Sequence, residues 1–226
     1  MNAPANDTPH SAGFSLIYIG DPMCSWCYGF GVPLGRLRER FPDLPVTMVL
    51  GGLRAGNTQV MDDALKAKLR NAWAGVAQRS GQPFSHALLE RTDFIYDTEP
   101  ACRAVVAVRD HAPQLALAMY HAIQHAFYAE GRDVTKAAVL GEIWDEVHGL
   151  SREAWGHIDF LRDFESEAVR ERTQGDFAQA RQWGVQGFPT LLGVVNGQAH
   201  ILTNGYVDAD VLVERLTRLT GQQAAG

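Results

Sequence analysis

Cysteine is scarce in this sequence, with only three residues in a chain of 226. A secreted protein held together by disulfide bonds would have more cysteines, spread along the chain. The chain is also long enough to bury a sizeable hydrophobic core, so it needs no disulfide for stability. Two of the three residues, Cys24 and Cys27, are separated by only two positions. This spacing indicates redox or metal chemistry instead.

Long apolar runs and runs of basic residues are missing as well. No segment approaches the roughly 20 apolar residues that a membrane-spanning helix requires. The first residues have neither the basic part nor the apolar part of a signal peptide. The net charge of -6 provides no basic surface for nucleic acid or anionic lipid. We therefore expect a cytoplasmic protein that binds neither nucleic acid nor membranes, with residues 1–13 as a disordered tail.

The N-terminal part of the chain has the pattern of a strand, a helix and a second strand. Residues 14–20 and 46–50 are rich in strand-forming side chains. From Ser25 onward, the apolar residues between them recur at helical spacing, and Pro33 would kink that helix without ending it. This order predicts a βαβ unit with parallel strands and a right-handed crossover.

The C-terminal part of the chain returns to strand patterns. Residues 190–195 and 199–203 are predicted strands joined by a tight turn, and a helix follows them. Between the two sheet-forming parts lie about 120 residues with helical periodicity, too many for a loop. We therefore predict an α/β domain built from residues 14–58 and 184–222, interrupted by a helical insertion over residues 59–183.

The motif Cys24-Ser25-Trp26-Cys27 lies where a predicted strand ends and a predicted helix begins. Two residues between the cysteines, in the first turn of a helix, bring the sulfur atoms within disulfide range. Unpaired amides and the helix dipole should lower the pKa of the Cys24 thiol and make Cys24 the nucleophile. Cys27 lies about one turn further along the helix and is the expected resolving thiol, which closes the intramolecular disulfide.

Two other interpretations of this cysteine pair remain open. The pair could form half of a zinc site, which would need two further ligands. The only close histidine pair is His121 and His125, four residues apart on a predicted helix. The cysteines could also be ordinary core residues, although the preceding Asp21-Pro22 and the tight spacing argue against this.

Three segments of the chain carry a family resemblance. Asp21-Pro-Met-Cys24-Ser-Trp-Cys27-Tyr-Gly-Phe resembles the active-site segment of DsbA-family thioredoxin-like proteins. Residues 125–133 are similar to a motif in the inserted helices of this family, and residues 180–190 are similar to its proline loop. The likeness covers residues 14–219. It is strongest to the cytoplasmic subgroup of predicted disulfide isomerases, FrnE-like and related to hydroxychromene-carboxylate isomerases.

The resemblance implies a thioredoxin fold with a large all-helical insertion between the second and third strands. It implies a thiol–disulfide oxidoreductase of the reductase or isomerase type, with Cys24 and Cys27 as its redox pair. It also implies that Phe188–Pro189 is a cis peptide facing Cys24, whose neighbouring backbone can pair with an extended substrate. Otherwise Pro189 would only begin a strand. We expect Pro189 to complete the catalytic site, and Phe188 and Gly187 to bind substrate.

Two further residues are candidate substrate contacts. Trp26 lies between the two cysteines and should be partly exposed, so that it offers an apolar surface. Gly52 follows the second predicted strand, at the sheet edge where open α/β sheets bind ligands, although an ordinary turn explains it equally well. The expected partner is a disulfide- or thiol-bearing protein or a small thiol. We expect no resident cofactor and no metal, with glutathione as the candidate redox partner.

The chain departs from its relatives at two positions. Thioredoxin and periplasmic DsbA have an acidic residue six positions before the nucleophile, thought to pass a proton to the second thiol. This sequence has Tyr18 there, so water or a residue of the insertion would have to take that role. Related isomerases and kappa-class glutathione transferases have serine at the nucleophile position, whereas this chain has Cys24. That favours redox chemistry over a glutathione-dependent isomerase or transferase, which stays the alternative function.

The third thiol, Cys102, is expected to be a small buried residue that turnover does not require. Relatives often have a histidine in the similar stretch, near the active site, which leaves a redox role for Cys102 as a second interpretation. A metal-binding or partner-binding protein with Cys24 and Cys27 as ligands is the least favoured reading of the whole chain.

Overall fold

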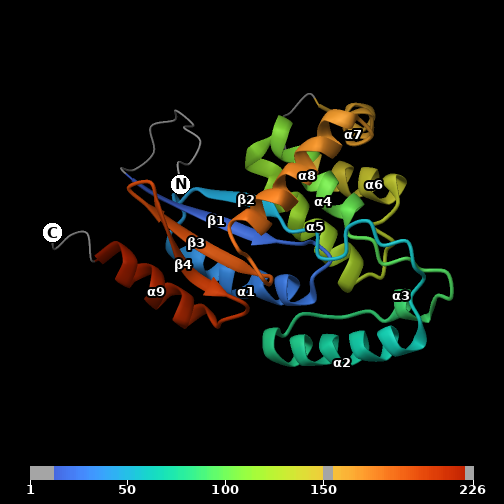
Figure 1. The fold of residues 1–226 in the computed structure, drawn as a ribbon, viewed down its shortest axis with the longest axis horizontal. Coiled ribbons are helices and arrows are strands. Elements are labelled where there is room, and N and C mark those ends of the chain that lie inside the picture. Colours follow the sequence, from blue (N-terminus) through green and yellow to red (C-terminus); the bar gives the residue numbers. More distant parts are fainter. Residues whose placement is uncertain (1–12, 150–154, 222–226) are drawn as a thin grey trace.

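The computed structural model describes residues 13–149 and 155–221 (Figure 1). Apart from Gly13, the tail expected over residues 1–13 lies outside these ranges. In the described part of the chain, four strands form one sheet in the order β2-β1-β3-β4. The helices between β2 and β3 gather on one side of the molecule. The predicted fold, a sheet interrupted by a helical insertion between its second and third strands, is confirmed.

The predicted βαβ unit is present at the N-terminal end. Strand β1 spans Phe14–Gly20, helix α1 spans Ser25–Arg40, and strand β2 spans Val46–Leu50. Strands β1 and β2 pair in parallel, as expected. Helix α1 continues through Pro33 and buries the apolar side chains that recur along one of its faces. The unit therefore places the N-terminus of α1 at the carboxyl edge of the sheet.

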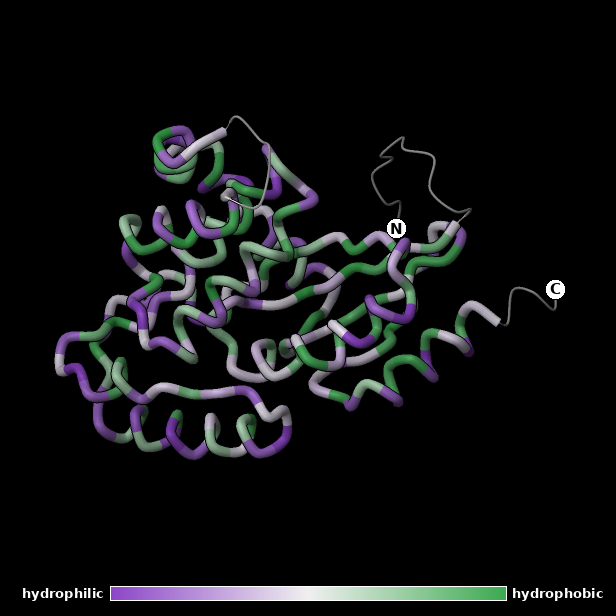
Figure 2. Tube along the Cα trace, turned by 180° about the vertical axis from the view of Figure 1, so that it is seen from behind, coloured by the Kyte–Doolittle hydropathy of each residue, from purple (hydrophilic) through white to green (hydrophobic). Residues whose placement is uncertain are grey.

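The insertion consists of helices. Their bounds are α2 (Asp63–Ser80), α3 (Ala87–Glu90), α4 (Glu99–His111), the 3-10 turn η1 (Pro113–Leu115), α5 (Ala116–Tyr128), α6 (Ala137–His148), α7 (His157–Phe164) and α8 (Glu167–Gln182). Figure 2 shows hydrophobic and hydrophilic segments alternating along these helices, as expected where one face is buried. None of the helices in the described ranges combines the length and the apolar character that a membrane crossing would require.

The C-terminal part completes the sheet. Strand β3 (Thr190–Val195) runs antiparallel to β1 and to β4 (Gln198–Asn204), and helix α9 (Ala209–Gly221) packs against α1. Asn196 and Gly197 both have positive φ, at 49° and 78°. This is the conformation that a two-residue hairpin turn requires. The predicted hairpin is therefore confirmed, with β4 beginning one residue earlier than expected.

An ion pair fastens the insertion to the edge strand β2. Arg109 of α4 donates to both carboxylate oxygens of Asp176 in α8, at 2.7 and 3.1 Å, and to the Met48 carbonyl at 2.8 Å. Asp176 also accepts the Leu50 amide at 2.9 Å. An edge strand presents backbone groups without a strand partner. These two side chains satisfy such groups and cover the edge.

Candidate active site

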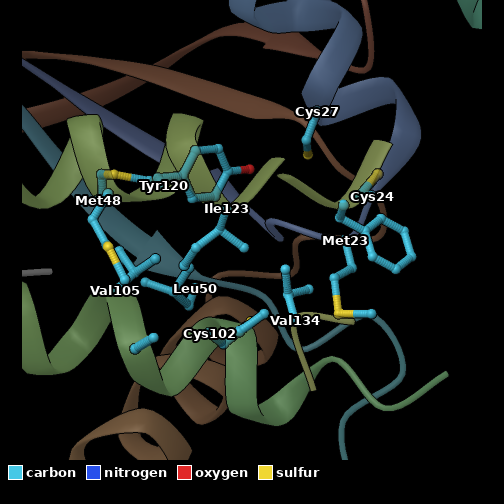
Figure 3. Close-up of a cluster of buried hydrophobic side chains, with 14 of the residues drawn as sticks. Met23, Cys24, Cys27, Met48, Leu50, Cys102, Val105, Tyr120, Ile123 and Val134 are labelled. Atoms are coloured by element: carbon cyan, nitrogen blue, oxygen red, sulfur yellow. The ribbon is translucent and has the colours of Figure 1, made fainter. Parts of the chain in front are cut away.

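Cys24 and Cys27 lie at the start of α1, as predicted. Cys24 is the N-cap residue, and its amide donates to the Asp21 carbonyl at 3.0 Å. Cys24 is 7% exposed and Cys27 is 0% exposed. All three cysteines are free thiols, so the structure represents the dithiol form. Figure 3 shows the two sulfur-bearing side chains at the tip of this helix, above the buried apolar cluster.

The pKa of the Cys24 thiol differs from the expectation. Its hydrogen bond with Cys27 and its burial raise the pKa of Cys24 well above the usual value. The negative charge of Asp21 adds to this increase. The helix N-terminus acts in the opposite direction, but its effect does not prevail against burial. The lowered pKa expected for Cys24 is therefore wrong for the dithiol form. Its greater exposure still favours Cys24 over Cys27 as the attacking thiol.

The proline loop lies against Cys24. The Phe188–Pro189 peptide is cis, as the family resemblance implied. The Cys24 thiol donates to the Phe188 carbonyl, with 3.7 Å between sulfur and oxygen. The Thr190 hydroxyl donates to the Gly187 carbonyl at 2.9 Å, which fixes the loop just before β3 begins. The structure thus brings the proline loop to the cysteine motif, with the Phe188 carbonyl in contact with Cys24.

A groove with a volume of about 840 Å³ adjoins the cysteine motif. Trp26, Phe188 and Tyr206 line it with aromatic rings, and Gln78 and Arg79 contribute polar groups from α2. Trp26 is 38% exposed, which confirms its expected partial exposure, and its ring centroid lies 5.6 Å from that of Tyr206. The groove therefore offers aromatic side chains next to the cysteine motif, with polar and cationic side chains among its other lining residues.

The glycines after β2 make room for aromatic rings of the protein itself. A Cβ atom at Gly51 would lie only 2.0 Å from the Phe188 ring, so the absence of a side chain here leaves room for the proline loop. Gly52 has a φ of +63°, and a Cβ atom there would lie 2.8 Å from the Phe177 ring. These observations agree with the interpretation of Gly52 as an ordinary turn residue. A contact between Gly52 and substrate stays a prediction.

Asp21 links the cysteine loop to the segment after β2. Its carboxylate is fully buried and accepts the Met23 amide at 2.8 Å and the Leu53 amide at 2.6 Å. Burial raises the pKa of Asp21. From the sequence, Asp21 was noted only as part of the segment that precedes the cysteines, without a role of its own. The sequence signal that could have marked Asp21 as a site residue was a carboxylate directly after a buried strand and beside the cysteine motif.

Cys102 lies beneath this loop. It is fully buried, and its thiol donates to the second carboxylate oxygen of Asp21, with 3.5 Å between sulfur and oxygen. Burial raises the pKa of Cys102 well above the usual value, which makes it a poor nucleophile. The buried position expected for Cys102 is confirmed, and its thiol supports the Asp21 carboxylate.

Two tyrosine hydroxyls lie beside Cys27. Tyr18 of β1 and Tyr120 of α5 are both buried, and their hydroxyl oxygens are 3.3 Å apart. Both hydroxyls lie close enough to the Cys27 thiol to interact with it electrostatically. Tyr18 was considered in the sequence, whereas Tyr120 was not. Its only signal was a hydroxyl on an otherwise apolar helix face.

The histidines considered for a zinc site have other surroundings. His125 pairs with Glu130 at 3.2 Å. His121 is half-buried, and the burial of its ring together with the charge of Arg38 lowers its pKa to about 4. Within residues 13–149 and 155–221, no group of three or more His, Cys, Asp or Glu side chains is placed to hold a metal ion.

The family model of the DSBA-like thioredoxin domain matches residues 20–217. The structure is similar to a candidate protein disulfide isomerase from Nitrosomonas europaea, with 32% identity, a TM-score of 0.83, and 93% of this chain and 98% of that chain covered. It is also similar to the cytosolic disulfide reductase DsbM from Pseudomonas aeruginosa, with 28% identity, a TM-score of 0.73, and 94% and 100% covered. That reductase has also been solved with GSH.

A 2-hydroxychromene-2-carboxylate isomerase is a more distant neighbour. Its identity is 18% and its TM-score is 0.60, with 93% of this chain and 98% of that chain covered. At this identity the likeness shows the fold alone. A comparison with curated protein sequences gave no match.

Proposed function

Because this chain belongs to the family of DSBA-like thioredoxin domains, we propose that it is a thiol–disulfide oxidoreductase with Cys24 and Cys27 as its redox pair. The observation that carries the proposal is the position of Cys24 at the N-terminus of α1, with its sulfur 3.7 Å from the Phe188 carbonyl. The relatives at 32% and 28% identity, described as a candidate disulfide isomerase and a disulfide reductase, support the same activity.

The reaction begins with attack on a substrate disulfide. The Cys24 thiolate forms a bond to one substrate sulfur, the substrate disulfide breaks, and the departing sulfur takes up a proton from water. Because Cys24 lies at the proline loop, an extended substrate can pair with the backbone there while its disulfide faces the nucleophile. This role for Phe188 and Pro189 is part of the proposal.

The second step releases the substrate. Cys27 attacks Cys24 in the mixed disulfide, the Cys24–substrate bond breaks, and the substrate leaves as a thiol. The enzyme is then an intramolecular disulfide. Two molecules of glutathione can return it to the dithiol, forming one glutathione disulfide. We propose this reducing direction and a cytoplasmic location, because the relative described as a cytosolic reductase has been solved with GSH.

The groove beside Trp26 is the proposed docking site for the group next to the scissile disulfide. Its aromatic lining suits an apolar or peptide segment. Arg79 lies 2.6 Å from Asp208 and over the ring of Tyr206, so it can exchange this partner for a carboxylate of the substrate. Peptides and glutathione disulfide both provide such carboxylates.

A redox titration tests the proposed function. The protein is equilibrated in buffers of defined ratio of reduced to oxidised glutathione, quenched by alkylation and analysed by peptide mass spectrometry. We expect a two-electron transition confined to Cys24 and Cys27. A midpoint near thioredoxin, at about −270 mV, indicates a reductase, and one near −120 mV indicates an oxidant.

The matched control is Cys102→Ser, which should titrate like the wild type. If no disulfide forms between Cys24 and Cys27 at any ratio, the proposed function is wrong. Turnover of a non-disulfide substrate in the presence of glutathione, with Cys27 dispensable, would then support the isomerase or transferase alternative.

A further inference from the structure

The second step requires a charged sulfur in a buried position. Cys27 must lose its proton to attack, and it is fully buried. A thiolate away from water is costly unless hydrogen bonds satisfy it. Asp21, the buried carboxylate of the cysteine loop, accepts the amides of Met23 and Leu53, and an ionised carboxylate has no proton to donate to a thiolate. Another group must therefore stabilise the negative charge on Cys27.

Two hydroxyls are placed for this task. Tyr18 and Tyr120 come from different parts of the fold, 102 positions apart, and their hydroxyl oxygens lie 3.3 Å apart beside Cys27. Figure 3 shows the Tyr120 ring with its hydroxyl directed toward Cys27. The gap that holds both hydroxyls depends on Gly20. A Cβ atom there would lie 2.6 Å from the Tyr120 hydroxyl and 3.1 Å from that of Tyr18.

Both tyrosines act as donors rather than as bases. Burial raises the pKa of Tyr18 and of Tyr120 well above the usual value, so each keeps its proton at neutral pH. Because the two tyrosine hydroxyls are in contact, one can donate its hydrogen bond to the other, and the second can donate to the sulfur of Cys27. Such a chain polarises its members and strengthens the terminal hydrogen bond.

We propose that the hydroxyls of Tyr18 and Tyr120 are catalytic groups that stabilise the Cys27 thiolate while it attacks the mixed disulfide. The inference rests on the proposed function and assigns the second step to these two side chains. The Cys24–Cys27 bond forms, the Cys24–substrate bond breaks, and its electron pair leaves with the substrate sulfur. The proton lost by Cys27 ends on that departing sulfur, so no further reactant is needed.

The test separates the two steps in one experiment. The reduced protein is mixed with dithiobis(nitrobenzoate) in a stopped-flow instrument. Attack by Cys24 releases one thionitrobenzoate, and resolution by Cys27 releases a second. We expect Tyr120→Phe and Tyr18→Phe to slow the second release by about ten- to one-hundred-fold, the effect of losing a hydrogen bond to a charged group. The first release should stay close to its wild-type rate.

Tyr28→Phe is the matched control, because it removes a buried hydroxyl that has no hydrogen-bond partner among the residues that the structure describes. Both releases should be unchanged in this variant. An unchanged second release in both Tyr18→Phe and Tyr120→Phe, or an equal slowing in Tyr28→Phe, would overturn the inference. Phenylalanine keeps the packed ring, and if one variant fails to fold, the other alone carries the test.

Comparison of the two releases separates donation from a structural role. Donated hydrogen bonds act on the charged sulfur of Cys27, so their loss should slow the second release alone. A structural defect in the site would slow both releases. If the wild type shows no second release at all, the proposed function fails. If the second release occurs normally in the wild type and neither tyrosine variant changes its rate, only the present inference is wrong.

Discussion

The sulfur of Cys24 lies 3.7 Å from the carbonyl oxygen of Phe188, although the two residues are 164 positions apart. The sheet register brings them together. Strand β1 pairs with β3 so that Ile19 lies opposite Thr190. Ile19 comes shortly before Cys24 in the sequence, and Thr190 comes shortly after Phe188. The helical insertion leaves this pairing intact, because it begins and ends at the same edge of the sheet.

Substitution of single cysteines should separate the proposed roles. Cys24→Ser should abolish disulfide reduction, because it removes the attacking sulfur. Cys27→Ser should still react once and accumulate a mixed disulfide, visible by intact mass spectrometry. Cys102→Ser should turn over close to the wild-type rate, since its hydroxyl can still donate to Asp21. A loss in Cys102→Ser comparable to that in Cys24→Ser would contradict the assignment.

The raised pKa of Cys24 predicts a steep pH dependence of its reactivity. Only the thiolate reacts, and a raised pKa keeps the thiolate fraction small at neutral pH. The alkylation rate of Cys24 should therefore increase about tenfold per pH unit, still rising at about pH 9. Cys27→Ala removes the hydrogen bond that raises this pKa most, so its profile should level off at lower pH. A wild-type plateau below neutral pH would rule this out.

Gly51→Ala should impair activity without unfolding the protein. The added methyl group would lie 2.0 Å from the Phe188 ring, so that ring and its carbonyl must move relative to Cys24. We expect kcat/KM for disulfide reduction to fall about tenfold or more, as misplaced reacting groups do. Gly35→Ala is the control, because a Cβ atom there would meet no described residue within 4 Å apart from its chain neighbours and the backbone of α1, and this variant should retain full activity. Normal activity in Gly51→Ala would mean that the loop position is not critical.

Trp26→Ala should weaken substrate binding in the groove. Buried aromatic anchors often contribute more than a factor of five to affinity, so KM for a peptide disulfide should rise by about five- to thirtyfold, with kcat little changed. Ile158→Ala removes a side chain that is 81% exposed and outside the groove, and serves as the control. Equal KM values for Trp26→Ala and the wild type would place the substrate elsewhere.

Asp176→Ala should destabilise the protein by about 2–3 kcal/mol, because it leaves Arg109 and the Leu50 amide without their partner. Urea unfolding followed by circular dichroism measures the change. Glu214→Ala breaks the exposed pair with Arg218 and should have little effect, since exposed ion pairs contribute little. Similar unfolding midpoints for the two variants would show that the pair does not fasten the insertion to β2.

Local patterns in the sequence were sufficient for most of the secondary structure. The strands at residues 14–20 and 46–50 were predicted at their observed bounds, because a short apolar run between turn residues has few alternatives. The C-terminal hairpin was predicted because Asn196-Gly197 readily adopts positive φ. The position of the cysteine motif at a helix start followed from these elements.

The pKa of Cys24 shows where local reasoning stops. The helix N-terminus is a local feature and predicts a lowered value. The Cys27 hydrogen bond, burial and the charge of Asp21 depend on how the chain packs, and together they raise the pKa of Cys24. The balance between them is a property of the folded site, because desolvation depends on every segment that covers the sulfur.

By itself, the sequence determined the order of the elements, the place of the cysteine pair and the family motifs, since these depend on residues close together in the chain. Only the tertiary structure decided which distant groups meet at the sulfur atoms: Phe188 at Cys24, Tyr18 and Tyr120 at Cys27, and Cys102 at Asp21. A helix pattern says which face is buried, but not which strand or thiol that face will contact. That choice is made when the insertion packs against the sheet.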